Sequence, residues 1–341
     1  MSILNAEKII IAFKKLSAFL GHPDEHFNNL ILSAPNHNAW FTREEVERSL
    51  AAFHAMLNDN DIEKWFEGIK VSDKPKKIGL ILAGNIPMVG FHDILSVLAT
   101  GNIALIKFSS SDDKLLPALL TELIKIEPLF ADRIVYTERL KDFDAIIATG
   151  SNNTSRYFEY YFGNVPNIIR KNRNSVAVLT GNETPEEIKK LGHDIFDYFG
   201  LGCRNVSKIY IPEGFDIKYF FEPLESFQPI FNHFKYNNNY DYNKSIYLVN
   251  GDKHLDNGFL LLKEDQQIAS PLAVLYYETY TDLASVEQAI NERADNIQCV
   301  VTQTSLHVNV ACAGFGESQS PKLWDYADNI NTIEFLNNLI D

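Results

Sequence analysis

The sequence predicts an α/β protein with two domains, each built on a parallel sheet with helical crossovers. After about residue 70, short apolar runs typical of buried strands alternate with amphipathic segments of helical period. This alternation is typical of parallel sheets whose strands are joined by helices. The chain has 341 residues, of which 45% are hydrophobic and 22% are charged, and this length is sufficient for two domains with separate cores.

In the first half, helices are expected before the first strand. Apolar residues recur at helical spacing over 6–19, and Thr42 with Glu45 resembles a capping box that opens an amphipathic segment reaching Leu57. A lysine-rich loop at 74–77 separates these helices from the alternating region. Strands are then expected at 78–83, 103–108, 133–136 and 144–149, with helices at 91–99 and from about 115.

In the second half the alternation resumes. Strands are expected at 175–179, 208–211, 245–249, 273–277, 299–302 and 308–313, with helices at 185–198 and 283–292. Residues 216–234 are expected to be partly helical, because Pro223 and Pro229 must interrupt a helix there. The Asn- and Tyr-rich stretch 236–243 is predicted to be an exposed loop.

Charge and cysteine content exclude several classes of function. The net charge of −14 argues against binding to nucleic acid or to anionic membranes, which needs a basic surface. The three cysteines suit neither a disulfide framework nor a zinc site. No apolar run reaches the ~18 residues of a membrane span, and no secretory leader is recognised. We therefore expect a cytoplasmic protein without a metal.

The most informative local feature is Cys203, which follows Gly200 and Gly202 and precedes Arg204 and a β-prone run. Glycines let a ligand approach the backbone closely, and a neighbouring cation raises the thiolate fraction of a thiol. A thiolate on a tight turn is typical of a covalent nucleophile. A buried structural cysteine is the alternative reading.

Three polar residues follow predicted strands of the first half. Asn85, Ser109 and Ser151 each come soon after the end of a strand. Binding sites in parallel sheets lie at the carboxyl ends of strands, so we expect these residues at one edge of the sheet.

Several segments, in chain order, resemble the aldehyde dehydrogenase superfamily. Residues 84–87, 98–102 and 106–110 resemble its Trp-Asn-Phe-Pro, Ala-Thr-Gly-Asn and Lys-Pro-Ser run. Gly150 and Ser151 resemble its Gly-Ser turn at the nicotinamide nucleotide, 199–210 its nucleophile segment, and 314–319 its late glycine-rich stretch. The resemblance implies an aldehyde-dehydrogenase-like fold and makes Cys203 the nucleophile.

Within this superfamily, residues 150–158, 169–179 and 198–210 resemble the long-chain acyl-CoA reductase family, which includes the reductase of bacterial bioluminescence. This resemblance implies NADPH-dependent reduction of a fatty acyl-CoA to an aldehyde through a Cys203 thioester. It also implies a role in fatty acid metabolism. Both chemical steps pass through an oxyanion, which hydrogen-bond donors stabilise by ~3–4 kcal/mol each.

The superfamily pattern also implies roles for other residues. Asn85 aligns with the oxyanion asparagine, although a loop asparagine that satisfies turn backbone is the alternative. Residues implied to bind the cofactor are Lys107, Ser109, Ser110, Gly150, Ser151 and Gln267. No acid follows Lys107 before Asp112, which leaves room for a 2′-phosphate and favours NADP(H) over NAD(H). A serine or aspartate helix cap is the alternative reading of 109–113.

Two segments depart from the superfamily. Hydrolytic members carry Glu-Leu-Gly-Gly-Lys where this chain has Arg170-Lys171-Asn172-Arg173-Asn174, so the base that activates water is missing, as acyl transfer from CoA requires. The cations of 170–173 could bind CoA phosphates or form a solvated basic loop. At 267–271, Gln267 replaces the glutamate that contacts the nicotinamide ribose.

The remaining candidates are histidines and cysteines. His193 and His307 could donate a proton to a departing group, or be structural. Cys299 and Cys312 lie in apolar runs and are expected in the core.

Four regions are expected. They are an N-terminal helical segment at 1–70, a nicotinamide-nucleotide-binding domain at 71–175, a catalytic domain at 176–312, and a C-terminal return segment at 313–341. Expected partners are a small-molecule acyl-CoA, a second copy in a homodimer, and a protein that donates the acyl group or accepts the aldehyde. Two other functions stay open: an acyltransferase or thioesterase-like enzyme using Cys203 without hydride transfer, and a non-catalytic binding protein with the same fold.

Overall fold

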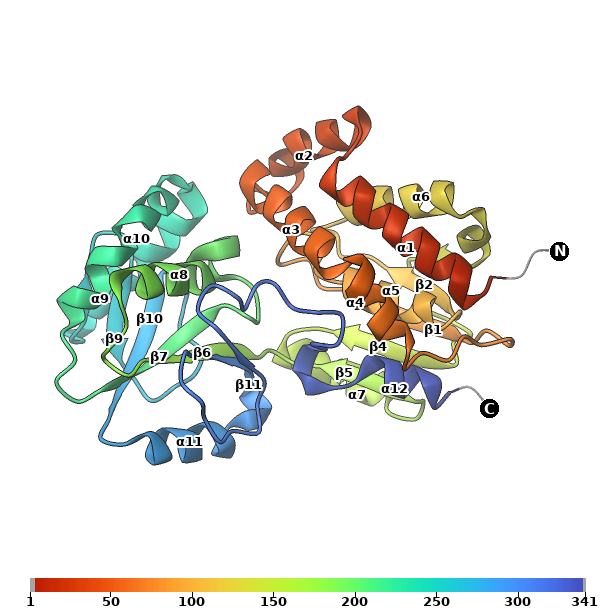
Figure 1. Ribbon diagram of the computed structural model, residues 1–341. Helices are drawn as coiled ribbons and strands as arrows, with labels where there is room; N and C mark the ends of the chain where they lie inside the picture. Colours follow the sequence, from red (N-terminus) through yellow and green to blue (C-terminus); the bar gives the residue numbers. More distant parts are fainter. Residues whose placement is uncertain (1–3, 340–341) are drawn as a thin grey trace. The chain divides into compact units, whose positions relative to one another are not determined.

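The computed structural model describes residues 4–339 and divides into two compact units (Figure 1). Of the described residues, the first unit takes those up to Asn172, Ser320–Tyr326 and those from Ile330. The second takes Arg173–Gln319 and Ala327–Asn329. Each unit contains one sheet, and all strand pairs are parallel except the pair of β8 and β9 at one edge of the second sheet. The predicted α/β class with two parallel sheets is confirmed.

The sheet of the first unit has the strand order β3-β2-β1-β4-β5. Its strands are β1 (Lys77–Ile81), β2 (Ile103–Lys107), β3 (Ile134–Tyr136), β4 (Ala145–Thr149) and β5 (Asn167–Arg170). Buried strands such as β1 and β4 read as continuous apolar runs, because helices cover a parallel sheet on both faces. The order makes β2, β1 and β4 neighbours, so their carboxyl ends lie at one edge.

Helices precede the first strand, as predicted, and four of them lie near the N-terminus. They are α1 (Ala6–Gly21), α2 (Glu25–His37), α3 (Arg43–Met56) and α4 (Asp59–Phe66), followed by α5 (Phe91–Ala99), α6 (Leu115–Ile126), α7 (Asn152–Phe162) and α12 (Thr332–Asn337), with the 3₁₀ turn η1 (Pro128–Asp132). Thr42 caps α3 by accepting from the Glu45 N–H at 3.4 Å. Phe13, Phe91 and Phe130 are fully buried in the core of this unit.

The sheet of the second unit has the order β12-β11-β6-β7-β10-β9-β8. Its strands are β6 (Asn174–Val178), β7 (Val206–Pro212), β8 (Leu255–Asp256), β9 (Leu261–Glu264), β10 (Val274–Tyr280), β11 (Ile297–Val301) and β12 (Cys312–Ala313). Its helices are α8 (Pro185–Phe196), α9 (Ile217–Leu224), α10 (Phe234–Asn250) and α11 (Leu283–Glu292), with the 3₁₀ turns η2 (Asp197–Gly200), η3 (Glu225–Asn232), η4 (Ala294–Asn296) and η5 (Ala327–Asn329).

Alternate residues of the central strands face two different cores in this unit. Ala177 and Ile209 pack in one core with α8 and α9, whereas Val176 and Tyr210 pack in the other with α11. Successive side chains of a strand point to opposite faces, so the helices cover both sides of the sheet, as Figure 1 shows for α8, α9 and α11.

The main error of the sequence prediction lies at 236–249. The expected loop at 236–243 and the expected strand at 245–249 both belong to the helix α10. Its composition is poor for a helix, but its buried residues Tyr236, Tyr240, Asn243 and Tyr247 recur at helical spacing. Packing of this face overrides the weak local propensity.

Other segments differ less from the prediction or agree with it. The strand expected at 308–313 is reduced to the two-residue edge strand β12, and Cys312 is exposed there rather than in the core. The helix α7 and the strands β5, β8 and β9 had not been predicted. The predicted partly helical region at 216–234 is confirmed as α9 and η3, with Pro223 and Pro229 inside.

Candidate active site

One group of candidate site residues lies at the carboxyl edge of the first sheet. Asn85 and Ser109 follow β1 and β2, and Ser151 follows β4. These three strands are neighbours, so the expectation that the three residues share one edge of the sheet is confirmed. Asn85 and Ser151 are exposed and Ser109 is half-buried.

The turns after β1 and β2 are in close contact. A Cβ added to Gly84 would lie 2.5 Å from Ser109 Oγ and 2.7 Å from Ser109 Cβ. Real Cβ atoms do not approach other atoms so closely, so the turn that carries Asn85 requires glycine at this position.

A buried carboxylate joins the same two turns. Asp112 is 5% exposed, and its Oδ2 accepts a hydrogen bond from the Met88 N–H at 2.6 Å. Met88 has a left-handed backbone, with φ of 55°, so this bond supports a strained residue three positions after Asn85. Burial raises the pKa of Asp112 to about 6, although the Met88 N–H opposes the rise. Among the described residues, Asp112 Oδ1 has no hydrogen-bond partner.

The residues expected at the adenosine end lie at the end of β2. Lys107 is its last residue and is exposed, as is Ser110. The Asp112 carboxylate is buried and hydrogen-bonded to the Met88 N–H, so it is not positioned to bind a ribose hydroxyl at the surface. The neighbouring Asp113 is exposed, and its Oδ2 lies 3.6 Å from Lys114 Nζ. A lysine ammonium and a serine hydroxyl are groups that can bind a phosphate.

Gly150 and Ser151 form the junction between β4 and α7. Ser151 is the N-cap of α7, and its Oγ accepts from the Thr154 N–H at 3.3 Å. A Cβ on Gly150 would lie 2.9 Å from a ring carbon of Phe158. A helix N-terminus at the end of a parallel strand fits a pyrophosphate group.

A separate group of candidate residues surrounds Cys203 in the second unit. Cys203 is half-buried and lies in the turn between η2 and β7. Three consecutive residues before it, Tyr198, Phe199 and Gly200, have φ of 55°, 57° and 77°. The left-handed region is unfavourable for bulky residues, so the chain reverses sharply just before the nucleophile candidate.

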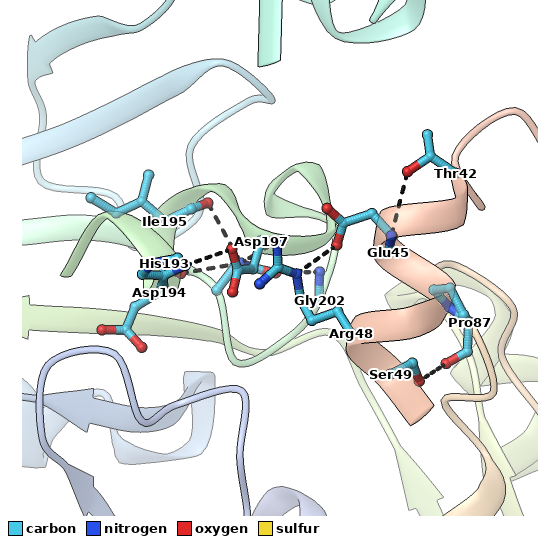
Figure 2. A network of polar contacts seen from close by, with 11 residues as sticks. Thr42, Glu45, Arg48, Ser49, Pro87, His193, Asp194, Ile195, Asp197 and Gly202 are labelled. Carbon is cyan, nitrogen blue, oxygen red and sulfur yellow. Dashed lines mark hydrogen bonds and ion pairs between the residues drawn. The ribbon is translucent and has the colours of Figure 1, made fainter. Parts of the chain in front are cut away.

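The Asn205 side chain holds this turn together. Its Nδ2 donates to the carbonyls of Asp197 at 2.8 Å and Asp194 at 3.1 Å, and its Oδ1 accepts from the Gly202 N–H at 2.8 Å. Figure 2 shows these labelled partners at the end of α8. From β6, Ser175 Oγ donates to the Cys203 carbonyl at 3.1 Å.

A buried acid on α8 holds the late glycine-rich stretch. Asp194 is fully buried, and its carboxylate accepts from the Gly316 N–H at 2.6 Å and the Ser318 N–H at 3.0 Å. Burial raises the pKa of Asp194 to about 6, although the Gly316 N–H opposes the rise. Because Asn205 bonds the Asp194 carbonyl, the glycine-rich stretch and the Cys203 turn meet at one point of α8.

Gln267 lies on a loop held by the strand after Cys203. Gln267 itself is exposed, while Ser207 Oγ donates to the Ile268 carbonyl at 2.7 Å and Lys208 Nζ donates to the Asp265 carbonyl at 3.0 Å. The Lys208 side chain is fully buried and pairs with Glu278 at 2.5 Å. Burial lowers the pKa of Lys208, although Glu278 opposes this.

The histidine candidates are positioned differently. His193 lies on α8, as predicted, with Nδ1 3.1 Å from Asp197 Oδ1 (Figure 2). His307 is exposed on the loop before β12, where its backbone N–H donates to the Glu287 carboxylate at 2.8 Å. Cys299 is buried, as predicted, and burial raises the pKa of its thiol to about 11.

The cations at 170–173 do not form an open patch. Arg170 is 5% exposed and donates to Asp93 and, at 3.1 Å, to Thr332. Lys171 Nζ lies 2.7 Å from Glu159, and Arg173 Nε lies 3.4 Å from Asp328. All three cations are paired with acids, and of the three only Lys171 is exposed. Binding of CoA phosphates by this segment stays a prediction.

Sequence reasoning found the ends of the strands and the Cys203 turn but missed Asn205, Asp194 and Ser175. The sequence did contain a hint of the role of Asn205, because asparagine soon after a glycine-rich stretch is a common turn residue. It also contained a hint that Asp194 is buried, because Asp194 lies at helical spacing from the apolar residues Ile188 and Leu191 of α8.

Comparison with known proteins decides the family. Residues 43–220, about half of the chain, match the family model described as acyl-CoA reductase (LuxC). The chain belongs to the acyl-CoA reductase (LuxC) family. The resemblance seen in the sequence is therefore confirmed, and the matched segment includes Asn85 and Cys203.

One curated relative is the long-chain acyl-protein thioester reductase 2 of Photobacterium leiognathi. It is 26% identical over 200 residues, which span 52% of this chain and 40% of that protein. This member of the acyl-CoA reductase (LuxC) family thus aligns with less than half the length of that relative.

Solved aldehyde dehydrogenases share the fold. Aldehyde dehydrogenase 21 of Physcomitrella patens matches with a TM-score of 0.68 and 15% identity, covering 99% of this chain and 85% of that one. An aldehyde dehydrogenase of Mycobacterium tuberculosis, solved with NAD⁺, matches with a TM-score of 0.65 and 13% identity, covering 97% and 83%. The aldehyde-dehydrogenase-like fold is confirmed. Among residues 4–339, the helices are all too short or too polar to cross a membrane.

Proposed function

We propose that the protein reduces a long-chain fatty acyl-CoA to the aldehyde with NADPH, through a thioester on Cys203. The observation that carries the proposal is the built turn around Cys203: a half-buried thiol in the turn that precedes the central strand β7, with its backbone fixed by Asn205 and Ser175. Membership of the acyl-CoA reductase (LuxC) family supports the same chemistry.

The first step is acyl transfer to the protein. The Cys203 thiolate attacks the thioester carbonyl carbon, the new C–S bond forms, and the C–S bond to CoA breaks as the CoA thiolate leaves. The oxyanion of this step needs donors held in place beforehand. In this proposal the donors are the Cys203 N–H and the Asn85 side chain, and the tight packing of Gly84 against Ser109 supports the turn that carries Asn85.

The second step converts the acyl-enzyme to the aldehyde. When bound, a nicotinamide would supply the hydride that adds to the acyl carbon; the C–S bond to Cys203 would then break, releasing the Cys203 thiolate and the aldehyde. In this proposal Lys107, Ser109 and Ser110 hold the adenosine end of NADP(H), Gly150 and Ser151 hold the phosphates, and Gln267 contacts the nicotinamide ribose. The first unit would then be the nucleotide-binding half and the second unit the catalytic half.

Water must be kept from the acyl-enzyme, since hydrolysis would waste it. Residues 170–174 contain no carboxylate where hydrolytic aldehyde dehydrogenases carry their base. In this segment Arg170 is itself buried against Asp93. The segment therefore supplies no group that could activate water, which favours reduction over hydrolysis.

The test is aldehyde formation from acyl-CoAs of increasing chain length, with NADPH or NADH. We expect NADPH-dependent aldehyde formation that is best with a long chain, is lost in Cys203→Ala, and is retained in Cys312→Ala, which changes an exposed cysteine. The same assay with an acyl group carried on a protein tests the other donor that the name of the P. leiognathi relative suggests. Acyl transfer without use of NADPH would instead indicate a transferase.

A further inference from the structure

The reversal before Cys203 needs an external support. Tyr198, Phe199 and Gly200 are all left-handed, and the first two carry bulky side chains. Such residues persist where the surrounding structure determines them, and each costs about 1–3 kcal/mol. Their position directly before the nucleophile candidate suggests that the strain serves the geometry of the turn.

Asn205 spans this reversal with one amide. It is 2% exposed, and it bonds Asp197, which lies before the left-handed residues, and Gly202, which lies after them. The site demands a group that donates from one atom and accepts at another. Among side chains of this size only an amide does so, since a carboxylate cannot donate and an alkyl group does neither.

The Asn205 backbone also orients the peptide of the nucleophile. The Asn205 N–H donates to the Gly202 carbonyl at 3.1 Å. That carbonyl shares a planar trans peptide with the Cys203 N–H, and the two groups point in opposite directions. The bond therefore directs the Cys203 N–H away from Asn205, and the Ser175 bond to the Cys203 carbonyl fixes the following peptide.

We propose that Asn205 is the positioning residue of the nucleophile: it closes the Cys203 turn and aims the Cys203 N–H at the oxyanion that forms when the thiol is acylated. This inference rests on the proposed role of Cys203 as nucleophile. It does not depend on the identity of the acyl donor or of the cofactor.

The experiment compares two reactions of Cys203 in the purified protein. p-Nitrophenyl acetate acylates the thiolate through a tetrahedral oxyanion and releases nitrophenolate, whereas iodoacetamide alkylates it by displacement of iodide without an oxyanion. Peptide mass spectrometry assigns both products to Cys203, with the exposed Cys312 as internal standard. The ratio of acylation rate to alkylation rate reports the oxyanion donor, and a general loss of stability does not move it.

Three variants separate positioning from structure. Asn205→Ala should lower the ratio by about tenfold or more, as expected when an oxyanion donor is misaligned. Asn205→Asp keeps the acceptor for the Gly202 N–H but loses the bonds that Nδ2 donates to the carbonyls of Asp194, Ile195 and Asp197, so its ratio should lie between Ala and wild type. Asn243→Ala is the matched control, because Asn243 is buried in the same unit and donates to the Leu272 carbonyl at 2.9 Å; its ratio should equal that of wild type.

A wild-type ratio in folded Asn205→Asp or Asn205→Ala would overturn the proposal, as would a wild-type Cys203 that p-nitrophenyl acetate does not acylate. Failure of the proposed function has a different signature: the ratio responds to Asn205, but no acyl-CoA yields aldehyde with NADPH.

Discussion

Replacing Asp112 by asparagine should change the pH dependence of the first unit's stability. The difference in unfolding free energy between Asp112→Asn and wild type should shift in favour of the variant as pH rises from acid to neutral. Asp112 is 5% exposed, and burial raises its pKa from 3.8 to about 6. The folded protein therefore holds a proton on Asp112 that the unfolded chain releases near its ordinary pKa. This group's contribution to stability is lost as pH rises from about 4 through about 6.

The structure sets the size of the effect. The difference between the pKa values of 3.8 and about 6 corresponds to about 3 kcal/mol. The introduced amide would keep an oxygen for the Met88 N–H but would bury an N–H₂ group, which costs about 1–3 kcal/mol at every pH if it finds no partner. The absolute difference in stability between variant and wild type thus includes an offset. Its change between pH 4 and pH 8 should be about 2.4 kcal/mol, because at pH 4 part of the unfolded chain's Asp112 is already ionised.

Tryptophan fluorescence gives a clean assay. The protein has three tryptophans, Trp40, Trp65 and Trp324, and all lie in the unit that contains Asp112. Urea unfolding followed by this signal at a series of pH values gives the free energy of unfolding of that unit. Asp113→Asn is the matched control, because Asp113 is exposed on the same turn. A difference between Asp112→Asn and wild type that does not change with pH would refute the reasoning.

Three further changes test the packing. Gly84→Ala should destabilise the first unit by about 1–3 kcal/mol, because the added Cβ would overlap Ser109. Gly68→Ala is the control, because a Cβ there meets nothing closer than 3.9 Å. Equal unfolding free energies of the two variants would contradict the prediction. Arg170→Ala should lower the free energy of unfolding by about 3–5 kcal/mol, because it leaves Asp93 buried without its cation. Lys171→Ala, which removes an exposed ion pair, should lower it by under about 1 kcal/mol. The same fluorescence assay measures both. Lys208→Met should lower the thermal unfolding midpoint, measured by circular dichroism, less than Glu278→Gln does. Lys208→Met removes the buried charge, whereas Glu278→Gln leaves that charge without its ion-pair partner. A larger drop for Lys208→Met would contradict the prediction.

Much of the fold could be predicted because the strands are short apolar runs whose ends coincide with turn residues. The helix α10 could not, since Asn and Tyr are weak helix formers and only the buried face of Tyr236, Tyr240 and Tyr247 reveals the helix. That face becomes evident only once the segment has a sheet to pack against.

The candidate site was predictable where its chemistry is local. Cys203 and its glycines lie within a few residues of each other, and Asn85, Ser109 and Ser151 follow recognisable strands. The cations of 170–173 were not interpretable, because their partners Asp93, Glu159 and Asp328 are not adjacent in sequence. The role of Asn205 depends on a left-handed turn that Tyr198 and Phe199 give no reason to expect.

The most direct test of the central claim is the intact mass of the protein after incubation with a long-chain acyl-CoA, before and after addition of NADPH. The account predicts a mass gain of one acyl group on wild type and on Cys312→Ala, none on Cys203→Ala, and its discharge as aldehyde when NADPH is added. Absence of the acyl-enzyme on wild type, or an acyl-enzyme that NADPH does not discharge, would contradict it.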